Sequence, residues 1–505
     1  MGHAQYDTDG FDQAAASKPM ERVAVKGCIF KDGRMLFLFK PDAARRLSIA
    51  PDLEEDLPGG CVEAGESWQE ALVREVREEG DNFGRGTIPE GERYVNLEYV
   101  SANPTGPFHV GHGRWASLGD AMARVMRHGG YDVYEEYYIN DHGNQMDVFG
   151  NSVNVRYQQL LGRDVEMPEA CYGGAYVKDI AQDIIDRDGD KWLNVSDEER
   201  VEAFREMAYD MTLKNQREVL ANFGTTFDKW FSERSLYVED ENGESAVSRS
   251  LDAMREKGYL YEKDGALWFR STDLGDDKDR VLIKGDGEAT YFMSDVAYHY
   301  DKMMRGFDHL IDLWGADHHG YIKRCECMLE AWGWPGALEV QLGQLVNLFR
   351  DGKAVRMSKR TGEMVTFEEL IDEVGVDATR YLMLSRSADQ PIDFDIEVAK
   401  KKDASNPVYY VQYAHARICS ILRKAADEAD AAAVEAGEMT MGELAEKIIP
   451  EDCDLTPLTH PSQLALIRKM ADFGNPIPLA ARDPPPSRLT QYAHALASLI
   501  HQSYI

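Results

Sequence analysis

The chain has 505 residues, of which 43% are hydrophobic and 29% charged, so it can bury a large core and form about three domains or more. No apolar run is long enough to cross a membrane, and the polar N-terminal stretch MGHAQYDTDGFDQ excludes a secretory signal. The net charge of -33 argues against nonspecific nucleic-acid binding, and seven scattered cysteines without a CxxC pair indicate reduced thiols rather than disulfides or zinc. We therefore expect a cytoplasmic protein that binds neither DNA nor a membrane.

The first part of the chain combines a hairpin pattern with an acidic helical one. Residues 1–20 are expected to be disordered, and Val23 to Lys40 alternates like a β-hairpin that turns at Asp32-Gly33. The following stretch, LPGGCVEAGESWQEALVREVREEG, resembles the box of Nudix hydrolases. The residues that match this box are Gly60, Glu66, Arg74, Glu75, Glu78 and Glu79.

The Nudix resemblance implies that Glu75, Glu78 and Glu79 lie on one helix face and could bind Mg²⁺ before a diphosphate. The match departs from the family at its end, because Gly80 follows the paired glutamates directly and leaves no room for the remaining Nudix strands. We interpret residues 21–81 as a partial Nudix-like α+β segment. An acidic amphipathic helix without catalysis explains the same residues equally well.

The segment from Tyr94 to Gln145 has the pattern of a strand, a glycine-punctuated loop, an amphipathic helix and a second strand. A right-handed unit of this kind places its first loop at the carboxyl edge of a parallel sheet, where ligands meet helix N-termini. His109 and His112 of the HVGH stretch fall at this turn. Their imidazoles can donate to triphosphate oxygens, while Gly106 and Gly111 allow a nucleotide to approach the backbone.

This loop fits a dehydrogenase, a P-loop enzyme or a zinc site poorly. It contains neither GxGxxG nor GxxxxGK[ST], the phosphate-binding patterns of the first two, and it lacks HExxH and a third ligand for zinc. Taken alone, the histidine pair would more often cap a helix or lie partly buried. A second phosphate-suited stretch, RDGKAVRMSKRTG at Arg350 to Gly362, favours ATP chemistry instead. A basic loop is otherwise usually only a solvated surface.

These two segments resemble the signatures of one family. SANPTGPFHVGHGR is similar to the first signature of arginyl-tRNA synthetases, and VRMSKRTG is similar to the second, the mobile loop of class I aminoacyl-tRNA synthetases. YYINDHGNQ, YVKDIA, FDKWFSE, WGADHHGYIKR and NPVYYVQYAHARI match the same family in the same order, from about Asn82 to the C-terminus. The resemblance implies a monomer that ligates L-arginine to tRNA(Arg) through an arginyl-adenylate, using ATP with Mg²⁺.

The resemblance also implies roles for single residues. His109 and His112 would hold the phosphates of ATP, and Ser358 with Lys359 would close over the leaving pyrophosphate. The opening position of the second signature is Arg356 where the general motif has lysine, which keeps the charge. The residues expected to bind ATP are Gly106, Gly111, Asp317, His318, Lys353 and Met357.

Recognition of a planar, always charged guanidinium requires carboxylates in fixed positions. Glu98 matches the family position beside the amino acid, and Tyr291 and Asp295 share one helical face, so that the ring can stack while the carboxylate pairs. Taken singly, each of these would more often be a surface polar residue. The remaining residues expected in the arginine pocket are Ser101, Asn103, Asn140, Asp141 and Gln145.

The resemblance predicts an α/β fold: a Rossmann-like parallel-sheet catalytic domain at 82–403 with a helical insertion at about 150–280. An α-helical anticodon-binding-like domain follows at 404–505 and looks truncated. In so acidic a chain, tRNA must use local basic patches and stacking tyrosines, although helical spacing makes the tyrosines more often core. The candidates are Lys400, Lys401, Lys402, Arg417, Arg423, Lys424, Tyr409, Tyr410 and Tyr413.

Three functions remain open at this point. The first is arginine–tRNA ligation, the second is a Nudix-type nucleoside diphosphate pyrophosphohydrolase with an appended synthetase-like module, and the third is a non-catalytic tRNA-binding remnant. The intact catalytic signatures favour the ligase.

Overall fold

The computed structural model describes residues 29–31, 34–36, 88–355, 365–449, 460–471 and 487–503. They fall into two compact units. The larger unit comprises Gly86–Tyr409 with Pro478–Gln491, and the smaller one contains an N-terminal hairpin and the C-terminal helices from Tyr410 onward.

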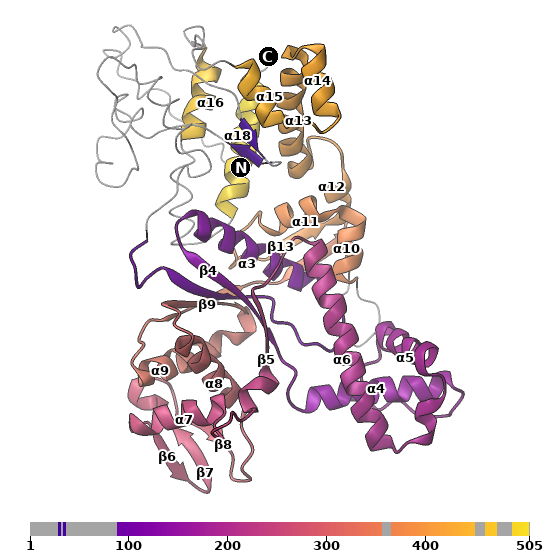
Figure 1. The fold of residues 1–505 in the computed structure, drawn as a ribbon, viewed down its shortest axis with the longest axis vertical. Helices are drawn as coiled ribbons and strands as arrows, with labels where there is room; N and C mark the ends of the chain where they lie inside the picture. Colours follow the sequence, from indigo (N-terminus) through magenta and orange to yellow (C-terminus); the bar gives the residue numbers. More distant parts are fainter. Residues whose placement is uncertain are drawn as a thin grey trace. The chain divides into compact units, whose positions relative to one another are not determined.

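The larger unit is built on a five-stranded sheet in which every neighbouring pair is parallel. In spatial order its strands are β10 (Leu338–Gly343), β9 (His309–Gly315), β3 (Tyr94–Glu98), β4 (Asp132–Ile139) and β5 (Lys229–Ser232). β3 lies in the middle, and its residues after Tyr94 are all buried, as expected for a strand covered on both faces. This sheet confirms the predicted Rossmann-like architecture (Figure 1).

Helix α3 (Val110–His128) is the crossover from β3 to β4. Its apolar side packs on the sheet, and Arg114, near its start, is fully buried. The Arg114 guanidinium donates to the backbone carbonyls of Gln344 (2.8 Å), Ser387 (2.8 Å) and Gln390 (2.6 Å). Burial lowers the pKa of Arg114 to about 10. These bonds join the start of α3 to two loops that are far away in the sequence.

The stretch from about 150 to 280, expected as one helical insertion, divides into parts. Helices α4 (Asn144–Leu160), α5 (Ala175–Asp188) and α6 (Asp197–Asn222) form their own apolar core. The chain then returns to the parallel sheet as β5, before α7 (Ala246–Glu256) and an antiparallel sheet. The strands of that sheet are β6 (Leu260–Lys263), β7 (Ala266–Phe269) and β8 (Arg280–Ile283).

Figure 1 shows α4 to α6 beyond one side of the central sheet and β6 to β8 beyond the other. Next to β6–β8 lie α8 (Tyr291–Met304) and α9 (Ile322–Trp332), which share a core with them. Downstream, a three-stranded sheet carries the α10, α11 and α12 helices. These elements are β11 (Val346–Arg350), β12 (Lys353–Ala354), β13 (Ile392–Asp395), α10 (Phe367–Val374), α11 (Val376–Met383) and α12 (Ile396–Lys400).

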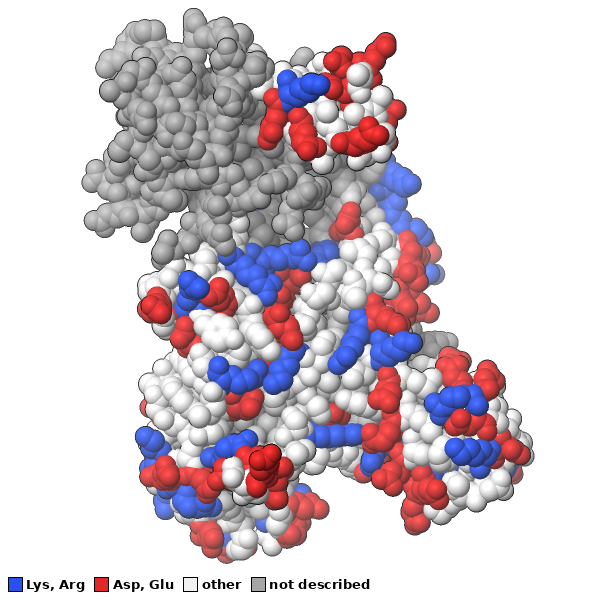
Figure 2. Space-filling view, in the orientation of Figure 1, with Lys and Arg blue, Asp and Glu red and all other residues white. Residues whose placement is uncertain are grey.

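The smaller unit is helical, as predicted for the C-terminal region. Its helices are α13 (Pro407–Ala425), α14 (Glu428–Glu435), α15 (Met441–Ile448), α16 (Pro461–Ala471) and α18 (Ser487–Ser503), of which α13 and α18 begin in the larger unit. Tyr413 of α13 is 46% exposed, so it is not a core residue. Acidic side chains dominate the visible face of α14 and α15 (Figure 2).

The N-terminal hairpin follows the sequence pattern. β1 (Ile29–Lys31) and β2 (Arg34–Leu36) pair antiparallel, with Lys31 opposite Arg34, in the order that the predicted hairpin requires. The Nudix-like glutamates Glu75, Glu78 and Glu79 lie outside the described residues. None of the helices in the described part of the chain has the length and apolarity that crossing a membrane requires.

Candidate active site

The candidate site lies at the carboxyl edge of the central sheet. Because its strands are parallel, the ends of β3, β4, β5 and β9 all meet this edge. Glu98 ends β3, Asn140 and Asp141 follow β4, Glu233 follows β5, and Asp317 follows β9. Residues scattered over more than two hundred positions are thus brought to one side of the sheet.

The HVGH turn forms the start of α3, with His109 as the N-cap residue. The His109 backbone N–H donates to Nδ1 of His112 at 3.1 Å, and the two rings stack with centroids 3.6 Å apart. Because Nδ1 of His112 accepts this bond, the proton of the neutral ring lies on Nε2, which makes that atom a donor. A ring donor at a helix N-terminus is suited to binding a phosphate.

The glycines near this turn serve different contacts. A Cβ on Gly111 would lie 2.9 Å from the His109 ring, so glycine is needed for the stacked arrangement. The space beside Gly106 holds the ring of Tyr176, and the Tyr176 hydroxyl donates to the carbonyl of Thr105 at 2.9 Å. The close approach at Gly106 therefore serves a contact with α5.

Most of the second signature, including Met357, Ser358 and Lys359, lies outside the described residues. Lys353, before it, is exposed on β12. After it, Thr366 forms a β-bridge with His109, and the Phe367 backbone N–H donates to the carbonyl of Phe108 at 2.9 Å. The chain that leaves the second signature is therefore fixed directly to the HVGH turn.

Glu98 anchors a strained turn after β3. Val100 and Ser101 have φ values of 67° and 38°, which are uncommon for residues with side chains and rare for a β-branched one. The Ser101 hydroxyl donates to Oε1 of Glu98 at 2.9 Å and accepts from the Tyr138 backbone N–H at 3.1 Å. Lys302 donates to the other oxygen, Oε2, at 2.7 Å.

Asp295 and Glu233 are carboxylates that face the same region. Asp295, on α8, is partly exposed to solvent. Burial of its carboxyl group raises the pKa to about 7. The negative charges of Glu233 and Glu98 raise the pKa further, whereas His299 lowers it. Burial likewise raises the pKa of Glu233, whose carboxylate bonds to Ser294. Perturbed carboxylates of this kind cluster at functional sites and suit a cationic ligand.

Sequence reasoning did not assign a role to Glu233, although it lies in the quoted FDKWFSE stretch. The residue is 5% exposed in a short 3₁₀ helix directly after β5. Glu233 lies at the carboxyl edge of the parallel sheet because β5 is a strand of that sheet, which the sequence pattern did not show. A glutamate at the carboxyl end of a buried strand was the available signal.

Several residues expected in the arginine pocket have protein partners. The Asp141 carboxylate is buried and accepts from the hydroxyls of Ser232 (2.6 Å) and Tyr209 (3.0 Å) and from the Arg234 backbone N–H (3.1 Å). It therefore ties β4 to β5 and α6. The Gln145 amide donates to the side chain of Asn140 at 2.7 Å.

Asn103 and Tyr291 are exposed, Tyr291 by 79%. The carbonyl of Asn103 accepts from the Gln216 side chain at 3.2 Å, which fixes its backbone and leaves the side chain at the surface. Asp317 and His318 lie 3.6 Å apart in η5 (Ala316–Tyr321), the 3₁₀ helix after β9, and both side chains are mostly exposed. These four side chains are therefore accessible to solvent and have no buried role among the described residues.

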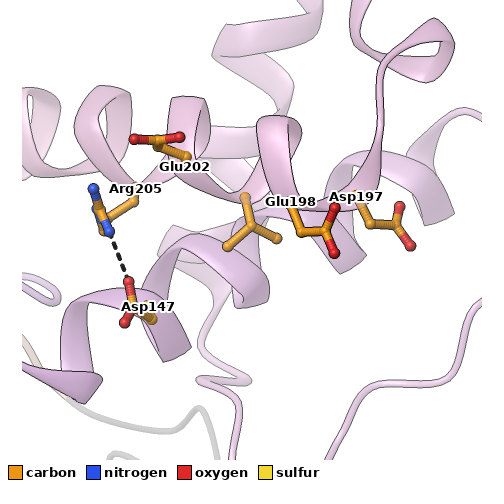
Figure 3. Close-up of a pocket in the computed structure, with 6 residues that line it drawn as sticks. Asp147, Asp197, Glu198, Glu202 and Arg205 are labelled. Carbon is orange, nitrogen blue, oxygen red and sulfur yellow. Dashed lines mark hydrogen bonds and ion pairs between the residues drawn. The ribbon is translucent and has the colours of Figure 1, made fainter.

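A separate hollow lies between α4 and α6 (Figure 3). Its lining is acidic except for Val201 and Arg205, and Arg205 is already paired with Asp147 at 2.8 Å. The other acidic residues that line it are Asp197, Glu198 and Glu202. Such a surface repels a polyphosphate, so this hollow is not the nucleotide site.

The comparison with known proteins decides the family. The family described as tRNA synthetases class I (R), catalytic domain, matches residues 82–420, which include the whole sheet edge described above. The chain belongs to the class I arginyl-tRNA synthetases. Residues 411–505 match the DALR anticodon binding domain, and residues 20–96 match the NUDIX domain.

Among curated arginyl-tRNA synthetases, the arginine–tRNA ligase of Syntrophotalea carbinolica is 47% identical over 86% of the chain and 74% of its own length. That of Geobacter sp. strain M21 is 46% identical over 87% and 75%. A crystal structure of an arginyl-tRNA synthetase from Campylobacter jejuni is 33% identical in sequence and superposes with a TM-score of 0.74. The match covers 86% of this chain and 90% of that one. The catalytic resemblance expected from the two signatures is thereby confirmed.

Proposed function

We propose that this protein activates L-arginine with ATP and transfers it to tRNA(Arg), as a monomer in the cytoplasm. The observation that carries the proposal is the pairing of an HVGH helix start with two perturbed carboxylates, Asp295 and Glu233, at one sheet edge. The first arrangement suits a polyphosphate and the second suits a guanidinium.

In this reaction the arginine carboxylate attacks the α-phosphorus of ATP, the bond to the β-phosphate breaks, and pyrophosphate leaves. A ribose hydroxyl at the tRNA end then attacks the carbonyl carbon of the adenylate, and AMP leaves. His112 would donate to the phosphates as charge develops there, and Lys359 would do the same from the second signature. Asp295 and Glu233 would hold the guanidinium, and Glu98 would lie beside the amino acid.

Mg²⁺ would enter with ATP. Among the described residues, no group of three His, Cys, Asp or Glu side chains is placed to hold a metal ion. Mg²⁺ commonly keeps several waters and binds mainly through substrate phosphates, so the protein does not need a metal cage of its own. The ion would screen the charge of the triphosphate in the site.

The direct test is aminoacylation of a tRNA mixture with each amino acid in turn, together with ATP–pyrophosphate exchange. Arginine should be the preferred substrate, and lysine and citrulline should be poor ones. The exchange assay should be run with and without tRNA, because members of this family can require bound tRNA for activation. Better activation of another amino acid would contradict the proposal.

Arginine binding should depend on pH. The Asp295 carboxyl pairs with a guanidinium only when it is ionised, and its pKa is about 7. Affinity for arginine should therefore rise about tenfold from pH 6 to pH 8, with proton release on binding at the lower pH. Calorimetry in two buffers of different ionisation enthalpy measures this release. Citrulline, which is neutral, serves as the control, and an affinity that does not change with pH would contradict the role of Asp295.

The match to the NUDIX domain supports a second candidate activity, hydrolysis of nucleoside diphosphate derivatives. The matched region runs to residue 96 and so includes the start of β3, which is the central strand of the synthetase sheet. A Nudix site needs carboxylates held around Mg²⁺ by a complete supporting sheet. A strand committed to the synthetase cannot supply that support, so we favour a remnant without hydrolase activity.

We expect little or no phosphate release from a panel of such compounds with Mg²⁺ or Mn²⁺. The variant Glu78→Gln with Glu79→Gln should leave arginine activation unchanged. Wild type and variant would be compared in both assays. Robust hydrolysis by the wild type that vanishes in the variant would make the protein bifunctional.

A further inference from the structure

Four carboxylates from four different elements surround the region proposed for arginine. They are Glu98 at the end of β3, Asp312 in β9, Asp295 in α8, and Glu233 after β5. Burying so many like charges is costly unless cations compensate them. One cation lies among them: Lys302 of α8, whose side chain is 0% exposed.

Lys302 divides these carboxylates into two pairs. Its ammonium donates to Glu98 Oε2 at 2.7 Å and to Asp312 Oδ1 at 2.8 Å. Burial opposes the charged form, but Asp312 and Glu98 outweigh it and raise the pKa of Lys302, so the ammonium stays charged. Asp295 and Glu233 form no ion pair with any lysine or arginine of the described residues.

The Asp312 side of this arrangement is saturated. His299 lies with Nε2 3.0 Å from Asp312 Oδ2, and its Nδ1 is 2.8 Å from the backbone carbonyl of Asp295. Lys302 and His299 therefore occupy one Asp312 oxygen each. Asp312 has no oxygen left that lacks a protein partner, and it acts as support for Lys302 rather than as a ligand.

Glu98 connects Lys302 to the strained turn at Val100 and Ser101. Held by Lys302 through Oε2, Glu98 presents Oε1 to the Ser101 hydroxyl, and Ser101 in turn supports the Tyr138 backbone. Two consecutive residues at positive φ, Val100 and Ser101, are strained and persist only where neighbours hold them. Glu98 can hold the turn only while its own position is fixed.

We propose that Lys302 is a positioning residue for arginine activation, an inference that rests on the proposed function. It compensates Glu98 and Asp312, fixes Glu98 under the strained turn, and leaves Asp295 and Glu233 as the carboxylates that meet the substrate guanidinium. An internal cation thus selects which carboxylates of an acidic cluster bind arginine. Without Lys302, Glu98 would be an uncompensated competitor for the cationic groups of the substrate.

The test is Lys302→Met, measured by aminoacylation kinetics with tRNA present. We expect the KM for arginine to rise by about tenfold or more, while the KM for ATP stays within about twofold of the wild-type value. A second variant, Lys302→Met with Asp312→Asn, removes the cation together with one of its two anions and should fold more readily. It should still raise the KM for arginine about tenfold, because Glu98 remains unanchored.

Arg305→Met is the matched control. Arg305 is a second cation of the α8 region, which pairs with the buried Glu136 of β4 at 2.6 Å and has no hydrogen bond or ion pair to Glu98 or Asp312 among the described residues. It should lower the melting temperature and leave both KM values within about twofold. A wild-type KM for arginine in the double variant, equal increases in both KM values, or the same pattern in Arg305→Met would overturn the proposal.

Two further outcomes are distinguishable. If both Lys302 variants fail to fold while Arg305→Met folds, Lys302 acts through stability and the positioning role is wrong. If the wild type does not activate arginine at all, the proposed function itself is contradicted.

Discussion

His112→Ala is expected to lower the rate of arginyl-adenylate formation by roughly a hundredfold or more, with a much smaller change in arginine affinity. Nδ1 of His112 accepts from the His109 backbone at 3.1 Å, which orients the ring and leaves the Nε2 proton as the donor. A preorganised donor strengthens its bond as charge develops on the phosphates, so its loss affects kcat more than KM. ATP–pyrophosphate exchange and single-turnover rates measure the two effects separately.

His128→Ala is the matched control for this prediction. It removes an imidazole from the other end of α3, about 24 Å along the helix from His112. Lys359→Ala should resemble His112→Ala, because the second signature is expected to act on the same phosphates. Activity equal to wild type in both His112→Ala and Lys359→Ala would remove these residues from the mechanism.

The long periodic elements of the fold could be predicted from the sequence. The alternation and helical spacing from Tyr94 to Gln145 correctly gave β3, α3 and β4, because each element is long enough for its period to show. The strand β5 has only four residues, Lys229–Ser232, and its single fully buried residue is Phe231. A pattern that short cannot distinguish a strand of the parallel sheet from a turn between helices, so the region was expected to be helical insertion.

The site was predictable where it follows from strand ends and signatures. Parallel topology brings Glu98, Asn140 and Asp317 to one edge, and all three were named from the sequence as candidate site residues. What it could not give is which polar groups are already satisfied by other parts of the chain. Asp141 accepts from three donors that come from β5, α6 and the turn after β5, and none of these contacts is local in sequence.

Lys302 shows the same limit more sharply. A lysine in a helix is almost always solvated, and nothing around Lys302 in the sequence predicts a side chain with no exposure. Its burial depends on two carboxylates, Glu98 and Asp312, from strands that are 204 and 10 residues away. Charge balance of this kind is a property of the assembled sheet edge and is not visible in local patterns.

Asp295→Asn is expected to weaken arginine binding by about 2 to 4 kcal/mol, or roughly 30- to 1000-fold. The carboxylate lies on α8 beside Glu233, and the amide that replaces it cannot pair with a guanidinium charge. Binding should be measured directly by calorimetry, with the KM for ATP as an internal reference that stays unchanged.

Asp301→Asn is the matched control, because Asp301 is on the same helix and pairs with Arg305 at 3.0 Å. The pH dependence of arginine binding should also flatten in Asp295→Asn, since the group that titrates near pH 7 is gone. If this variant binds arginine with wild-type affinity and an unaltered pH profile, Asp295 does not bind the guanidinium and Glu233 does so alone.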